Sequence, residues 1–129
     1  MEQALRALLT SALPHVPATH INWGEHPQSA GRPYIVLHLI STISGHHMQG
    51  PEAMERSRVQ VDCFARQFGD ARALAAAAKG ALDFHRGGRF LGILFDGLRT
   101  SREAPGDDGD ALYRASQDFL VNWRADHAG

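Results

Sequence analysis

The stretch that decides the fold is residues 58–84, RVQVDCFARQFGDARALAAAAKGALDF, because its hydrophobic period changes halfway along. From Arg58 to Ala65 apolar and polar residues alternate, which predicts a strand with one buried face. From Ala71 to Phe84 apolar residues recur at the three- and four-residue spacing of a helix. Asp70 precedes this run and is predicted to be the N-cap, because its carboxylate can accept free N–H groups of the first turn.

The remaining elements are predicted outward from this stretch by the same two periods. Two helices and five strands are expected in the order α-β-β-β-α-β-β, which is typical of an α+β fold. The predicted architecture is one mainly antiparallel β-sheet with both helices packed on one face. The further elements are a helix over Glu2–Leu13 and strands over His20–Trp23, Tyr34–Ile43, Met54–Ala65, Phe90–Glu103 and Ala111–Arg124.

Length and composition limit the class of protein. A chain of 129 residues predicts a single domain over residues 1–129, with residues 125–129 as a frayed tail. The formal net charge of −1 argues against a dedicated nucleic-acid binder. The single cysteine, Cys63, allows no disulfide within the chain, which is typical of a reducing cytoplasm. We expect neither a signal peptide nor a membrane-spanning segment.

No pattern in the sequence predicts a catalytic, cofactor or metal site. The adjacent His46 and His47 point apart on an extended chain, and no HExxH motif or paired Cys/His set accompanies them. Cys63 shares the apolar face of its strand, so we expect a buried structural cysteine and not a nucleophile. The aspartates of residues 107–110 lack the register of an EF-hand and are interpreted as a solvated hairpin tip. An enzyme is therefore not expected.

Two strings of residues carry a family resemblance. They are Arg58–Ala65 (RVQVDCFA) and Leu112–Phe119 (LYRASQDF), and they occur in a chain that also has PYIV at 33–36 and GP at 50–51. On these strings the chain resembles the small tail-completion and tail-terminator-like proteins of long-tailed phages, prophages and gene transfer agents. Members of this family are often known only as tail components of unknown function.

The resemblance implies a structural virion protein without a cofactor. It would cap the tail tube and join it to the head connector, as a homohexamer on assembly and as a monomer in isolation. Its partners would be the tail tube protein and head–tail connector proteins, with DNA only in transit and no membrane. It would be present in the bacterial host cytoplasm during assembly and then in the virion tail. Such a cap must fit the tube on one face and refuse a further ring on the other.

Two sets of residues are predicted to make the contacts, although solvated loops are an equal alternative for the first set. The partner-contact loops are His46, His47, Met48, Gln49, Gly50, Asp107 and Asp108. The subunit or lumen contacts are Arg56, Arg58, Arg66 and Arg114. Two other functions stay open at this point: a small binding module or enzyme with a similar α+β layout, and contact between these arginines and nucleic acid.

Overall fold

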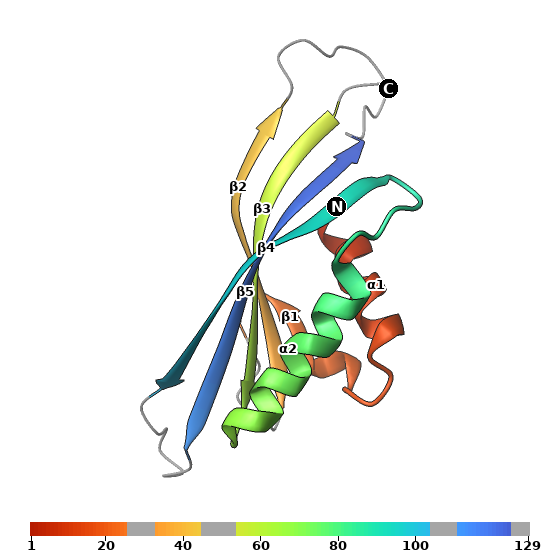
Figure 1. Cartoon of the computed structure of the whole chain (residues 1–129). Coiled ribbons are helices and arrows are strands. Elements are labelled where there is room, and N and C mark those ends of the chain that lie inside the picture. Colours follow the sequence, from red (N-terminus) through yellow and green to blue (C-terminus); the bar gives the residue numbers. More distant parts are fainter. Residues whose placement is uncertain (26–32, 45–53, 104–110, 125–129) are drawn as a thin grey trace.

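The computed structural model describes residues 1–25, 33–44, 54–103 and 111–124 (Figure 1). Two α-helices and five β-strands are present, together with a short 3-10 turn, η1, before the first strand. The elements are α1 (Glu2–Ala12), η1 (Ala18–His20), β1 (Ile21–Trp23), β2 (Tyr34–Ser44), β3 (Met54–Ala65), α2 (Phe68–Leu82), β4 (Phe90–Glu103) and β5 (Leu112–Arg124). No helix in the described part of the chain is long and apolar enough to cross a membrane.

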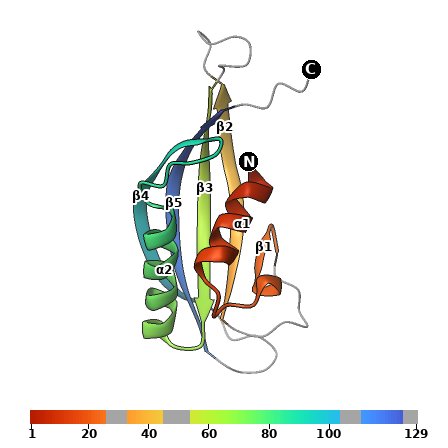
Figure 2. The same cartoon turned by 90° about the vertical axis from the view of Figure 1, so that its right-hand side faces the viewer.

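The five strands form one twisted sheet in the order β1-β2-β3-β5-β4. The short β1 pairs parallel to β2, and every other pairing is antiparallel. Both helices cover the same face of the sheet, and Figure 2 shows α1 and α2 side by side in front of it. The predicted α+β fold, with a mainly antiparallel sheet and two helices on one face, is confirmed.

The core lies between this face and the helices. Because strand side chains alternate between faces, β3 directs Val59, Val61 and Cys63 into the core and Arg58, Gln60 and Asp62 to the other face. Each fully buried aliphatic side chain contributes roughly 1.5–3 kcal/mol. Small residues on α2 allow its backbone to approach the sheet closely. The buried helix residues are Leu5 and Leu9 of α1 and Ala71, Leu74, Ala75, Ala78 and Leu82 of α2.

The predicted boundaries of the second helix are wrong at both ends. The helix begins at Phe68 with Gln67 as N-cap, so Asp70 lies inside the first turn. A carboxylate at that position still interacts favourably with the helix dipole. The helix ends at Leu82 because the next residues turn to pair with β4. Phe84 N–H donates to the Ile93 carbonyl at 2.7 Å, and the Phe84 backbone takes the left-handed region at φ 65°.

The sheet has two open edges, and different pairs of strands are connected at its two ends. β1 pairs with β2 only from Ile35 to Leu37, so in the described chain no strand pairs with the outer edge of residues 38–44 of β2, whose inner edge pairs with β3. At the other edge β4 pairs only with β5. β2 ends and β3 begins at one end of the sheet, and β4 ends and β5 begins at the opposite end.

Candidate functional site

The open face of the sheet, defined as the face that the helices leave uncovered, carries three of the four predicted contact arginines. Arg56 and Arg58 alternate along β3 with its buried residues and therefore lie on this face. Arg114 of β5 pairs with Phe64 of β3, which lies on the same face as Arg56 and Arg58, so Arg114 also lies on the open face. Arg66 does not, because it follows β3 and lines a cavity of about 310 Å³ on the helix side, together with His15, Asp70 and other residues.

The buried carboxylate of Asp62 organises the middle of the open face. The Asp62 side chain is 2% exposed and forms an ion pair with Arg114 Nη2 at 3.1 Å. Gln60 Nε2 donates to both carboxylate oxygens at 2.9 and 3.0 Å, and His38 Nε2 lies 3.3 Å from Oδ2. Three neighbouring strands thus supply the polar groups that a buried charge requires. The Asp62 cluster therefore serves the scaffold.

Three further arginines of the open face are also bonded within the chain. The pairs are Arg58 Nη1 with Asp96 Oδ2 (2.8 Å), Arg99 Nη1 with Asp118 Oδ2 (3.0 Å), and Arg56 Nε, which donates to Asn122 Oδ1 (2.9 Å). Each acidic partner lowers the positive potential that its arginine offers to an external anion. The open face is consequently a nearly neutral polar surface, which attracts a phosphate backbone less than four unpaired arginines would.

Cys63 is buried in the core, as the alternation along its strand predicted. Burial, with a smaller effect from the charge of Asp62, raises the pKa of the Cys63 thiol far above its ordinary value. A thiol held in this way forms almost no thiolate at neutral pH and is a poor nucleophile. Within the described ranges, no three His, Cys, Asp or Glu side chains converge so that they could hold a metal ion.

A groove, called here the α2–β4 groove, lies between α2 and the edge strand β4 on the helix side. It contains a cavity of about 190 Å³. Gln117 of β5 forms part of its wall and is 2% exposed. Gln117 Nε2 donates to the Ala75 carbonyl at 3.0 Å, whereas Oε1 is buried and has no hydrogen-bond partner among the described residues. The lining residues are Arg72, Ala75, Ala76, Lys79, Phe95, Leu98 and Gln117.

The most exposed large apolar side chain of the described chain belongs to Phe84, at 75%. It sits on the strained backbone that ends α2, and an exposed aromatic side chain on a strained backbone is a candidate partner contact. Other exposed apolar side chains lie at the sheet edges: Ile40 (52%) and Ile43 (61%) on β2, and Leu94 (44%) on β4. These positions extend the candidate contact surface beyond the arginines.

The structure brings Arg56, Arg58 and Arg114 together and leaves Arg66 apart. The predicted loop contacts His46, His47, Met48, Gln49, Gly50, Asp107 and Asp108 lie outside the described residues. The groove was missed by the sequence analysis, although one signal pointed to it. Gln117 is a polar residue in an otherwise apolar alternation from Tyr113 to Trp123, which is typical of a buried side chain with a specific partner.

Comparison with known proteins identifies the family. The family model described as "Tail completion protein gp17" matches residues 3–122. A search of curated proteins found no match. A chain of the solved structure "Virion of native gene transfer agent (GTA) particle" is 19% identical, with a TM-score of 0.63 over 94% of this chain and 95% of that one. A second solved chain is 20% identical, with a TM-score of 0.50 over 98% of this chain and 99% of that one.

At these identities the two solved structures show that the fold is shared. The family match says more than the shared fold, because it compares sequences over residues 3–122, from α1 into β5, and includes both strings that carried the resemblance. The chain therefore belongs to the tail completion protein gp17 family and is a structural component of a phage-type tail.

Proposed function

We propose that this protein is a ring subunit, hexameric on assembly, that caps the tail tube and joins it to the head connector. It would act without catalysis, after synthesis in the bacterial host cytoplasm. The family match over residues 3–122 is the observation that carries the proposal. The occurrence of the same fold in a gene transfer agent virion supports a role inside an assembled particle.

The two open edges of the sheet support a ring. A ring requires a heterologous contact, in which one surface of a subunit meets a different surface of the next. The outer edge of β2 presents Ile40 and Ile43, and the edge strand β4 on the opposite side presents Leu94. Unpaired strand edges with exposed apolar side chains favour association with another chain. We therefore assign the subunit contacts to Ile40 and Ile43 on one side of the sheet and to Leu94, near the start of β4, on the other, with the exposed Arg56 nearby on the open face.

The two ends of the sheet support a cap with two different faces. β2 ends at Ser44 at one end of the sheet, before segment 45–53, and β4 ends at Glu103 at the opposite end, before segment 104–110. Residues of the first, from His46 to Gly50, would contact one neighbour of the ring, and Asp107 and Asp108 of the second would contact the other. A cap needs this division, because the face that binds the tube must differ from the face that binds the connector.

DNA would pass through such a ring without being held. Arg58 and Arg114 are paired with Asp96 and Asp62, so they offer little net positive charge to phosphates. Weak binding suits a lumen, since affinity for phosphates in the ring would oppose the movement of the genome.

Tube growth in the presence of the protein tests the proposal. Purified tube protein is polymerised with and without this chain, tube lengths are measured by electron microscopy, and the mass of the complex is measured by sedimentation. We expect shorter tubes that carry a terminal ring. An Ile43→Lys variant should lose the ring and the length control, whereas Ile43→Val should retain both. A chain that remains monomeric with the tube protein and leaves tube length unchanged would overturn the proposal.

A further inference from the structure

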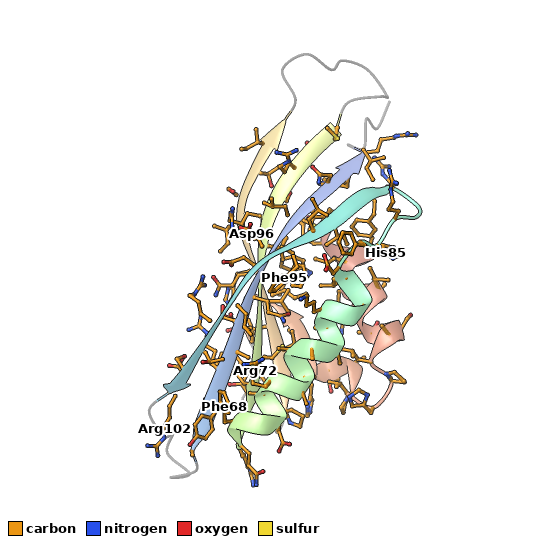
Figure 3. All side chains as sticks on the ribbon, viewed as in Figure 1. Phe68, Arg72, His85, Phe95, Asp96 and Arg102 are labelled. Atoms are coloured by element: carbon orange, nitrogen blue, oxygen red, sulfur yellow. The ribbon has the colours of Figure 1, made fainter. Side chains whose placement is uncertain are left out.

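We propose that the α2–β4 groove binds an acidic, extended segment of a partner protein, which adds to the sheet as a strand beside β4. The inference rests on the proposed function only for the class of partner, a neighbouring virion protein. Figure 3 shows the groove from its open side, with Phe68 and Arg72 on α2, and Phe95 and Arg102 on β4.

The outer edge of β4 has a closed part and an open part. Near its start the segment after α2 occupies the edge: Ile93 N–H donates to His85 O, and Phe95 N–H donates to Asp83 Oδ1 at 2.9 Å. Beyond Phe95, no backbone group in the described ranges pairs with this edge. The open part, from Gly97 to Glu103, is as long as an average strand.

The register identifies the backbone groups that an added strand would meet. Ile93 directs its N–H and C=O outward and faces Val121 of β5. In an antiparallel sheet the direction of hydrogen bonding alternates along a strand, so every second residue of β5 from Val121 faces an outward-bonding residue of β4. These residues on the open part of the edge are Leu98, Thr100 and Arg102, which face Gln117, Ala115 and Tyr113. Strand addition would supply their missing partners.

The charge of the groove selects an acidic occupant. None of Arg72, Lys79 and Arg102 has an acidic partner in the part of the chain that the structure describes. Lys79 instead places Nζ 4.0 Å above the Phe95 ring, and the nearby Asp83 is used by the Phe95 backbone. On the open face, by contrast, the corresponding cations are neutralised. These are Arg58, Arg99 and Arg114, each in an ion pair.

The cavity adds a polar and an apolar requirement. The unpaired Oε1 of Gln117 needs a donor, and an N–H or O–H group that enters the cavity would supply it. Phe95 and Leu98 line the same cavity and favour an apolar neighbour for that donor. An extended segment directs alternate side chains toward the groove. We therefore expect acidic and small apolar or amide residues at every second position of the bound segment.

Selection from a library of random displayed peptides on the purified protein tests this inference. We expect enrichment of sequences with Asp or Glu at alternate positions. The Arg72→Glu protein should not enrich them, whereas the matched charge reversal Arg124→Glu, at an exposed position outside the groove, should. For one synthetic enriched peptide, Kd from fluorescence anisotropy should rise at least tenfold with Arg72→Glu and less than twofold with Arg124→Glu. Thermal melting checks that both variants are folded.

Hydrogen exchange with the same peptide locates the binding mode. Exchange of the amides of Leu98, Thr100 and Arg102 should slow on binding. Failure to enrich acidic peptides over the Arg72→Glu selection, or protection confined to other strands, would overturn the inference. A self-associated protein that Arg72→Glu makes monomeric would assign the groove to a second copy and would also overturn it. Because these tests need no tube protein, the inference and the capping function can fail separately.

Discussion

Replacement of Gln117 by leucine should stabilise the protein, although it removes a hydrogen bond. Gln117 is 2% exposed, and only its Nε2 atom is satisfied, by the Ala75 carbonyl at 3.0 Å. A buried acceptor without a partner costs about 1–3 kcal/mol, whereas the Nε2 bond contributes about 1 kcal/mol. The Ala75 carbonyl lies inside α2 and keeps its helical partner. Gln117→Leu should therefore raise the free energy of unfolding by about 1 kcal/mol.

Gln60 provides the matched control, because replacement of this residue by leucine should lower the stability of the protein. Gln60 Nε2 donates to both oxygens of Asp62, whose carboxylate is buried. Hydrogen bonds to charged groups contribute about 1.5–3 kcal/mol, and their loss leaves part of a buried charge unsatisfied. Gln60→Leu should lower the free energy of unfolding by about 2 kcal/mol.

Urea unfolding followed by circular dichroism measures both effects. If the m-values of the two variants match that of the wild type, the shifts in midpoint report stability alone. In a chain of this size each kcal/mol also moves Tm by roughly 3–5 °C. The reasoning would be refuted by a Gln117→Leu protein that is less stable than the wild type by 1 kcal/mol or more. That result would mean that Oε1 has a partner in solution or that leucine leaves a void.

Three further predictions concern the rest of the scaffold. Asp62→Ala should lower the free energy of unfolding by about 3 kcal/mol in the same urea assay, since it leaves Arg114 without its buried partner, and adding Arg114→Met should recover part of the loss. Phe84→Gly should raise stability by up to about 1 kcal/mol, because it relieves the left-handed backbone and the lost side chain is mostly exposed; a loss of stability would show that this ring packs. Because burial raises the pKa of the Cys63 thiol in the folded state, its contribution is present below the ordinary pKa of 9.0 and is lost above it. Above that pH the wild type should lose up to about 1.4 kcal/mol per pH unit more than Cys63→Ala, and equal slopes would contradict the assignment.

The sequence predicted the elements well where one period dominates. The strands Met54–Ala65 and Phe90–Glu103 were predicted with the boundaries that the structure shows. The second helix was misplaced because its ends depend on other parts of the chain. Phe84 and His85 leave the helix because their backbone groups hydrogen-bond to Ile93, which lies nine residues beyond Phe84. No pattern in the sequence near Phe84 indicates these bonds.

The candidate surfaces were predictable only in part, for a topological reason. Alternation along β3 placed Arg56 and Arg58 on one face, as the structure confirms. Their partners could not be predicted, because β5 inserts between β3 and β4 and so determines which side chains lie across the sheet from them. The groove has the same origin. It requires α2 to lie beside an edge strand that follows it in sequence, and periodicity carries no information on that placement.

The insertion of β5 between β3 and β4 also governs when the subunit can fold. Residues 112–124 pair along their whole length with two strands that the ribosome makes earlier. Until they emerge, β3 and β4 cannot join into one sheet, and both expose backbone that only β5 can cover. Folding must therefore follow synthesis of this last strand, because its contacts are non-local. A chain interrupted before residue 112 would lack the strand that joins β4 to the rest of the sheet, so assembly would receive only subunits whose translation had passed β5.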